Sequence, residues 1–255
     1  MSDTIEAIQA VKNDLPAKAD PRAVIRQTLD HYKPVVHKLL VGTGINEETF
    51  TAWVANAMRA APKLWQCEPA TVLGATLRCA QLGLAPNDSR NLAWIIPYGN
   101  QATFQIGYGG VMELARRATP GLRFDGRPVY PNDEFDLDYG RVQQLTHRPA
   151  LALNLERGGD AYAWYVRASF PDGSEQVHAL DREGVEYHRQ FSKTKNAGMW
   201  VDNYDAAALK SVVMDMKRWL PSSAQLAAGL ASDEQTMTPE DVGEIEHAEI
   251  VEGEE

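Results

Sequence analysis

The segment from Gln81 to Arg117 constrains the fold more than any other part of the chain, because it combines helix, turn and strand patterns. Leu92 to Tyr98 is rich in apolar and aromatic residues and predicts a strand. Gly99-Asn100 predicts a tight turn, and Ala102 to Ile106 predicts the returning strand of a hairpin. Helical patterns lie on both sides of this hairpin, which favours a mixed fold of helices and antiparallel strands.

A glycine-rich run, Gly107-Tyr108-Gly109-Gly110, follows the hairpin and leads into a helix whose last turn holds Arg116 and Arg117. Glycines let a backbone or a ligand approach closely, and the free N–H groups of a helix N-terminus favour phosphate. Phosphate donors beside aromatic faces suit a single-stranded nucleic acid. The alternative is an ordinary hairpin and core helix with turn glycines. The polar and aromatic candidates near this turn are Tyr98, Asn100, Gln105 and Tyr108.

The rest of the chain predicts helices before this segment, and strands followed by a final helix after it. Pro34 should split the first long helix, and Asn46 should cap the next one. Asp202 and Asp205 resemble a capping pair for the last helix, which Pro221 stops. We therefore expect an α+β fold: N-terminal helices, a small antiparallel sheet with a central helix, a C-terminal helix and a disordered acidic tail. The expected domains are a mobile arm at residues 1–20, a core at 21–222 and a flexible acidic tail at 223–255.

The charge of the chain is unevenly distributed. Its 255 residues carry a net charge of −10, but residues 233–255 contain ten acids and no Lys or Arg, so residues 1–232 are formally neutral. A neutral body does not by itself indicate nucleic-acid binding, so any such site must come from local clustering. The clearest cluster runs from Arg189 through Lys193 and Lys195, with no acid before Asp202. Further cations follow on the last helix at Lys210, Lys217 and Arg218, and the alternative is a solvated loop and helix face.

Several classes of protein are disfavoured by the sequence. No apolar run is long enough to span a bilayer, and the N-terminus lacks the pattern of a signal peptide, so we expect a cytoplasmic protein. Cys67 and Cys79 do not have the spacing of a zinc site and are expected to be buried thiols. No Gly-Lys-Ser/Thr follows the glycine run, so it is not a nucleotide-binding Walker A loop.

A metal-dependent nuclease is one alternative function. Its candidate ligands for hard cations are Asp133, Glu134, Asp136, Asp138 and His147. Alternation along the strand places three of these acids on one face, which is also the pattern of the solvated face of a sheet. A non-catalytic oligomeric adaptor that acts through the acidic tail is the other alternative.

Several motifs, in order and at the same spacing, resemble those of the RecT family of phage single-strand annealing proteins. They are QLGLAPN from Gln81, IIPYGN from Ile95, FQIGYGGVMELARR from Phe104, VYPNDEF from Val129 and KTKNAGMW from Lys193, with PKLWQC from Pro62 upstream and LKSVV and KRWLP near Lys210 downstream. The resemblance covers about residues 20 to 222. It implies an ATP-independent protein that binds single-stranded DNA and pairs complementary strands in recombination, not an enzyme, with no catalytic residue, metal or cofactor.

The resemblance also implies partners and binding residues. The implied partners are single-stranded DNA, the annealed duplex intermediate, further copies in a ring or helical filament, a phage 5′–3′ exonuclease and a host single-strand-binding protein, with no membrane. Copies would hold the DNA backbone in a groove made by the Lys193–Lys195 loop, the final helix, and the central hairpin and helix. The expected DNA-binding residues are Lys193, Lys195, Lys210, Lys217, Arg218, Arg189, Arg116, Arg117, Tyr98, Asn100, Gln105, Tyr108, Arg59 and Lys63.

Overall fold

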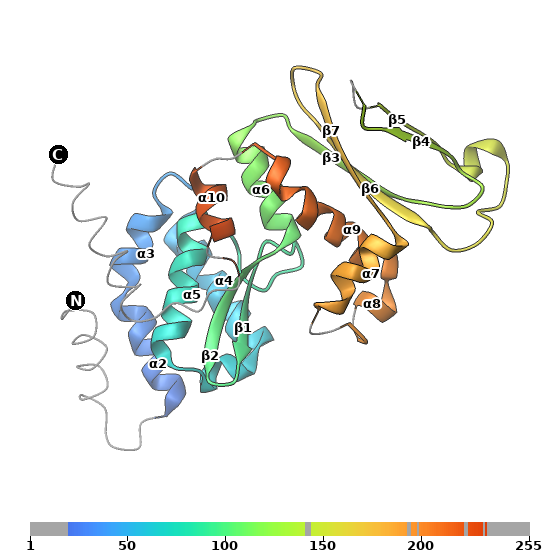
Figure 1. Cartoon of the computed structure of the whole chain (residues 1–255). Helices are drawn as coiled ribbons and strands as arrows, with labels where there is room; N and C mark the ends of the chain where they lie inside the picture. Colours follow the sequence, from blue (N-terminus) through green and yellow to red (C-terminus); the bar gives the residue numbers. More distant parts are fainter. Residues whose placement is uncertain are drawn as a thin grey trace. The chain divides into compact units, whose positions relative to one another are not determined.

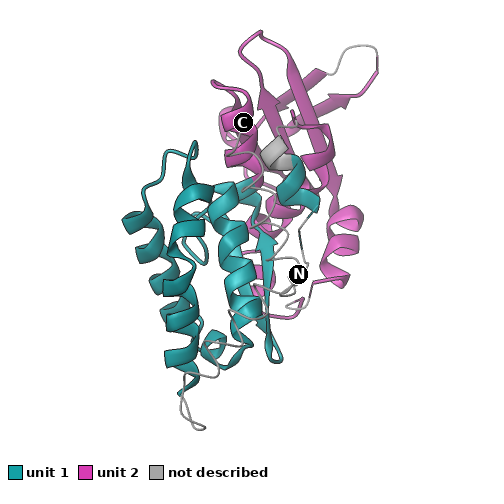
Figure 2. Ribbon diagram, turned by 90° about the vertical axis from the view of Figure 1, so that its left-hand side faces the viewer, with its two compact units in different colours: residues 1–110, 223–255 teal, residues 111–222 magenta. Residues whose placement is uncertain are grey.

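The computed structural model describes residues 20–140, 144–192, 195–197, 199–221, 224–231 and 233 (Figure 1). It confirms the predicted α+β class, with helices and small antiparallel sheets. The chain divides into two compact units (Figure 2). Unit 1 comprises residues 1–110 and 223–255, and unit 2 comprises residues 111–222. The predicted N-terminal arm and most of the acidic tail lie outside the described residues.

Unit 1 begins with short helices whose ends follow local sequence rules. The long helix predicted from Arg22 is split at Tyr32, and Pro34 lies in the first turn of the second half, where its missing N–H costs nothing. Asn46 caps the next helix, as predicted, by accepting a hydrogen bond from Thr49 N at 2.7 Å. These elements are α2 (Pro21–His31), α3 (Lys33–Leu40), α4 (Glu47–Ala60) and the 3-10 helix η1 (Pro62–Gln66).

Helix α5 (Pro69–Leu82) is the core of unit 1 and is buried along almost its whole length. Helices α2 and α3 and the hairpin strand β2 (Gln101–Ile106) all contact it, so small residues such as Gly74 suit its crowded surface. Gly83 ends the helix in the left-handed conformation (φ 59°, ψ 40°), as the sequence predicts. Cys79 on this helix and Cys67 just before it are free, buried thiols, and burial raises the pKa of both.

Strand β1 (Ala93–Tyr98) and strand β2 form the predicted hairpin. Tyr98 pairs with Gln101, so the loop is the two-residue turn Gly99-Asn100, with Gly99 at a φ of +61°. The hairpin is fastened to α5 because Ala102 N donates to Thr71 Oγ1 at 3.0 Å. A helix that the sequence did not predict, α10 (Ala224–Ala231), also contacts α5.

Unit 2 contains a three-stranded antiparallel sheet in the order β3-β6-β7. Its central strand is the most buried, and alternate side chains on it face opposite layers. Trp164 Nε1 donates to Asp205 on the helical side, whereas the Tyr165 hydroxyl meets His147 on the other. The strands are β3 (Arg123–Val129), β6 (Ala163–Ser169) and β7 (Glu175–Asp181).

The sheet is covered on its helical side by α9 (Tyr204–Met216), which contacts all three strands. The other layer is a second hairpin, β4 (Glu134–Asp138) with β5 (Gln144–Arg148), whose Phe135 and Leu145 pack on a buried cluster around Tyr165. The remaining elements are α6 (Tyr108–Ala118), the 3-10 helix η2 (Ala150–Leu153), α7 (Arg182–Gln190), α8 (Met199–Asp202) and the 3-10 turn η3 (Lys217–Trp219). Within the described residues, no helix combines the length and the apolar character that crossing a membrane requires.

The predicted cap of the last helix is wrong in detail. Asn203, not Asp202, is the N-cap of α9, and its side chain accepts from Ala206 N at 3.2 Å. Asp205 instead accepts hydrogen bonds from Trp164 Nε1 at 2.9 Å and from the Tyr130 hydroxyl at 3.0 Å. A tertiary contact therefore uses the carboxylate that local spacing had assigned to a cap.

Candidate nucleic-acid interface

The glycines before α6 are required by the packing of the chain against itself. A Cβ atom on Gly107 would lie 1.8 Å from the carbonyl oxygen of Asn91, and one on Gly110 would lie 2.1 Å from that of Leu92. Gly107 N also donates to the Leu92 carbonyl at 3.0 Å. The close approach that these glycines allow is therefore used by the loop at residues 88–92, which supports the turn-glycine alternative over a phosphate cradle at this place.

Replacing Gly109 with alanine should destabilise unit 1 by about 1–3 kcal/mol, the usual cost of overpacking. The new Cβ would lie 2.2 Å from the Arg90 carbonyl oxygen, and a backbone atom cannot rotate away as a side chain can. Chemical denaturation of the wild type and the variant measures the difference. A variant as stable as the wild type would show that the loop at residues 88–92 is free to move.

The hairpin presents candidate binding residues of unequal availability. Tyr98 is exposed at the end of β1, and Gln105 is half-buried. Asn100 is tied to the start of α5, because its Nδ2 donates to Glu68 Oε1 at 2.7 Å and its carbonyl accepts from Glu68 N at 2.7 Å. Asn100 therefore holds the turn in place.

The other unit 1 candidates lie at the start of α6 and near the end of α4. Tyr108 is half-buried, and its hydroxyl lies 3.5 Å from Asn91 Nδ2. Arg59 and Lys63 are both exposed, and Arg59 donates to Asn56 one turn earlier on the same helix. Unit 1 thus presents two exposed cations and one exposed tyrosine among the predicted residues.

In unit 2, Arg189 of α7 contacts the basic loop, the segment at residues 191–198 between α7 and α8, through Lys195. Its Nε donates to the Lys195 carbonyl at 2.8 Å, and its Nη1 pairs with Glu186 at 3.2 Å. Its guanidinium also lies 5.8 Å from the Trp200 ring centre and 5.9 Å from that of Tyr204. These contacts tie Lys195 to α7.

The phenol of Tyr204 joins this arrangement. Its hydroxyl donates to Glu186 at 2.6 Å, and this hydrogen bond lowers the pKa of Glu186. Burial, followed by the same hydrogen bond, raises the pKa of Tyr204 to about 12. Glu186 is thus an anion and Tyr204 a neutral donor at physiological pH, and the pair braces α7 against α9.

An exposed cation and two exposed aromatic rings occur within nine residues of one another in the chain, on α7 and in the segment after it. Lys195 is exposed, and within the described residues no partner is recorded for its ammonium group. Tyr187 and Phe191 are 60% and 69% exposed, and their ring centres are 5.1 Å apart. Lys193 lies outside the described residues. Exposed cations and solvent-facing rings are the side-chain types that bind the phosphates and the bases of a single strand.

Further cations follow on and after α9. Lys210 is exposed on α9, and Lys217, directly after the helix, keeps helical dihedrals (φ −50°, ψ −32°). Because they are seven residues apart, the two lysines lie two helical turns apart on the same face. Arg218 is exposed but pairs with Asp215, and the neighbouring Trp219 is also exposed. On α6, Arg117 pairs with Glu113 at 3.1 Å, and Arg116 lies over the Phe124 ring.

The carboxylates proposed for a nuclease do not form one site. Glu134, Asp136 and Asp138 line the exposed face of β4, as alternation predicts. The side chain of Asp133 is only 1% exposed and pairs with His147 at 3.0 Å. Within the described residues, no group of three or more His, Cys, Asp or Glu side chains is arranged to hold a metal ion. Asp133 is therefore buried in a hydrogen-bonded pair, whereas Glu134, Asp136 and Asp138 face solvent.

The sequence did not single out three exposed aromatic residues that lie near predicted binding cations in the chain: Tyr187, Phe191 and Trp219. Apolar residues on a helix usually face the core, so local patterns did not place these three rings in solvent. One pattern was available, because each lies within four residues of a predicted binding cation. The combination of an aromatic and a nearby cation, rather than charge alone, would have identified them.

Comparison with known proteins agrees with the resemblance seen in the sequence. The model of the RecT family matches residues 48–250, which is most of the chain and includes part of the acidic segment. Protein RecT of Escherichia coli (strain K12) is 30% identical over 195 residues, covering 72% of this chain and 71% of that protein. The uncharacterized protein YqaK of Bacillus subtilis (strain 168) is 24% identical over 253 residues, covering 96% and 87%. The chain therefore belongs to the RecT family, which supports a role as a single-strand annealing protein in DNA recombination.

Proposed function

We propose that this protein binds single-stranded DNA and anneals complementary strands without ATP, as a homo-oligomer arranged along the strand. The observation that carries the proposal is the family match over residues 48–250. The chemistry needs no covalent step, because the barrier is the mutual repulsion of two phosphate backbones. Protein cations offset this repulsion, and an extended strand presents its bases in register.

The principal DNA contacts are proposed on unit 2, at the loop after α7 and along α9. Lys193, Lys195, Lys210 and Lys217 would bind phosphates, each adding about 0.7 to the salt dependence of single-strand binding. Tyr187 and Phe191 would stack on bases, while Arg189 holds the loop. The other predicted contacts remain part of the proposal: Arg218, Arg116, Arg117, Tyr98, Asn100, Gln105, Tyr108, Arg59 and Lys63.

The partners follow from the same proposal. We expect the protein to hold the annealed intermediate, to work with a phage 5′–3′ exonuclease, and to displace or recruit a host single-strand-binding protein. No metal or nucleotide is required for pairing.

The direct test mixes two complementary oligonucleotides, one carrying a fluorophore and the other a quencher, with purified protein in EDTA and without ATP. Quenching much faster than in buffer supports the proposal; an unchanged rate without strand binding overturns it.

Replacing Phe191 with alanine should weaken binding to labelled oligo(dT) about fivefold, since a stacked base contributes roughly 1 kcal/mol or more. Fluorescence anisotropy measures the dissociation constant. Tyr162→Ala is the matched control, because it removes another exposed ring of unit 2, next to the start of α7 rather than after its end. Equal affinities for both variants would exclude Phe191 from the binding surface.

A further inference from the structure

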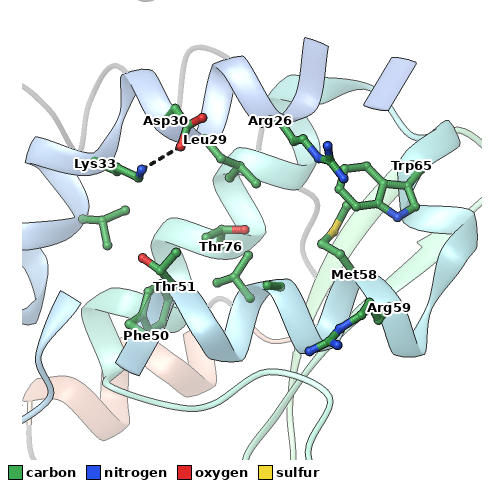
Figure 3. Close-up of a pocket in the computed structure, with 13 residues that line it drawn as sticks. Arg26, Leu29, Asp30, Lys33, Phe50, Thr51, Met58, Arg59, Trp65 and Thr76 are labelled. Atoms are coloured by element: carbon green, nitrogen blue, oxygen red, sulfur yellow. Dashed lines mark ion pairs between the residues drawn. The ribbon is translucent and has the colours of Figure 1, made fainter. Parts of the chain in front are cut away.

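An apolar groove with a volume of about 370 Å³ lies among the helices of unit 1 (Figure 3). Side chains of α2, α3, α4 and α5 form its walls, and Trp65 of η1 stands at one end. Its volume is in the range of sites that bury a small ligand or a few side chains. The apolar lining residues are Leu29, Val36, Phe50, Val54, Met58 and Trp65.

The charged residues that line the groove are mostly basic. They are Arg26, Lys33 and Arg59, with Asp30 as the one acid among them. The Arg26 guanidinium lies 5.4 Å from the Trp65 ring centre, and Lys33 pairs with Asp30 at 2.8 Å towards the opposite end (Figure 3). An apolar floor with a net positive rim is complementary to a segment that carries both apolar and acidic side chains.

The chain itself contains a segment of this chemistry. Residues 234–255 hold nine acids and no Lys or Arg, with Val242, Ile245, Ile250 and Val251 placed between the acids. The described residue that precedes the segment, Asp233, belongs to unit 1, where its carboxylate accepts from Ile106 N at 2.9 Å.

The segment is also long enough to reach the groove. Helix α10, just before Asp233, contacts α5, and Thr76 of α5 lines the groove. Twenty-two residues can span up to about 73 Å. A compact body of about 100 residues, the size of the described part of unit 1, has a radius of gyration of only about 13 Å. The groove is therefore within reach of the segment.

We propose that residues 234–255 dock in this groove of their own chain. Their apolar side chains enter it, and their carboxylates face Arg26, Lys33 and Arg59. The contact is internal to the chain and forms without DNA. Docking would cover Arg59, so a DNA strand that uses Arg59 would compete with the segment.

Photo-cross-linking in the full-length protein tests the docking. p-Benzoylphenylalanine replaces Ile245, and mass spectrometry maps where the irradiated side chain attaches. We expect attachment at groove residues such as Leu29 and Met58. The same probe at Glu255, at the end of the acidic run, should give at least threefold less of these products. Attachment mainly outside the groove overturns the proposal.

Two controls make the test specific. Ala55→Glu adds bulk and negative charge to the groove wall and should lower the cross-link yield at least threefold. Ala52→Glu makes the same change at an exposed position of α4 that does not line the groove, and should leave the yield unchanged. Equal yields in both variants contradict the proposal. A mixture of ¹⁵N-labelled and unlabelled protein identifies cross-links between copies, and a majority of these would overturn docking within one chain.

Discussion

Replacing Lys193 and Lys195 together with alanine should remove most of the annealing activity and leave the fold intact. If each lysine neutralises one phosphate, losing both reduces single-strand affinity roughly 25-fold at 0.1 M salt and lowers the salt dependence by about 1.4. Lys195 is exposed on the loop that Arg189 holds, so its removal leaves no buried charge. Anisotropy titrations over a salt series give both quantities, and the fluorophore–quencher assay gives the rate.

Arg123→Ala combined with Arg148→Ala is the matched control. It also removes two positive charges from exposed positions of unit 2, on β3 and β5, away from the basic loop. It should change affinity and salt dependence far less than the lysine pair. Equal losses in the two double variants would mean that net charge alone, rather than the loop, decides DNA binding.

Replacing Asp133 with alanine should lower the free energy of unfolding by about 3–5 kcal/mol, as expected when one partner of a buried, hydrogen-bonded pair is removed. The Asp133 carboxylate accepts from Tyr130 N at 2.8 Å and from Ala150 N at 2.6 Å, besides its pairing with His147. An ionised carboxylate only accepts, so His147 Nε2 carries a proton, and His147 Nδ1 lies 3.1 Å from the Tyr165 hydroxyl. Losing Asp133 leaves both N–H groups and the imidazole without this acceptor.

Chemical denaturation measures this loss, and Asp136→Ala is the control. Asp136 is exposed on the neighbouring strand, so its replacement should change stability by no more than about 0.5 kcal/mol. A similarly small effect for Asp133→Ala would contradict the structural role. A cleavage activity lost only with Asp133 would instead restore the nuclease alternative.

The difference in stability between the wild type and Asp133→Ala should depend on pH and should shrink as the pH falls. Burial alone would raise the pKa of Asp133, but the hydrogen bonds from Tyr130 N, Ala150 N and His147 outweigh it and lower the pKa below its usual value. A carboxylate whose pKa is lowered by folding stabilises the folded state at pH values above its unfolded pKa of about 3.9. That stabilisation is lost as the pH falls through the pKa of the folded state. The wild type should therefore lose its advantage over Asp133→Ala only below about pH 4.

The sequence by itself determined the features that depend on neighbouring residues. The turn at Gly99-Asn100, the N-cap at Asn46, the helix end at Gly83 and the split near Pro34 all follow from local backbone chemistry. The exposed acids of β4 follow from the two-residue period of a strand. The family also follows from the sequence, because several short motifs occur in a fixed order.

Only the tertiary structure decided how each candidate group is held. The glycines before α6 contact the chain's own loop, Asn100 clamps α5, and Arg189 is bound within its unit. Tyr187 and Phe191, which the sequence did not single out, face solvent. The physical reason is that hydrogen-bond partners and burial depend on residues distant in the chain. Asp133 and His147 are 14 positions apart in the chain and meet only when β4 pairs with β5 in the hairpin.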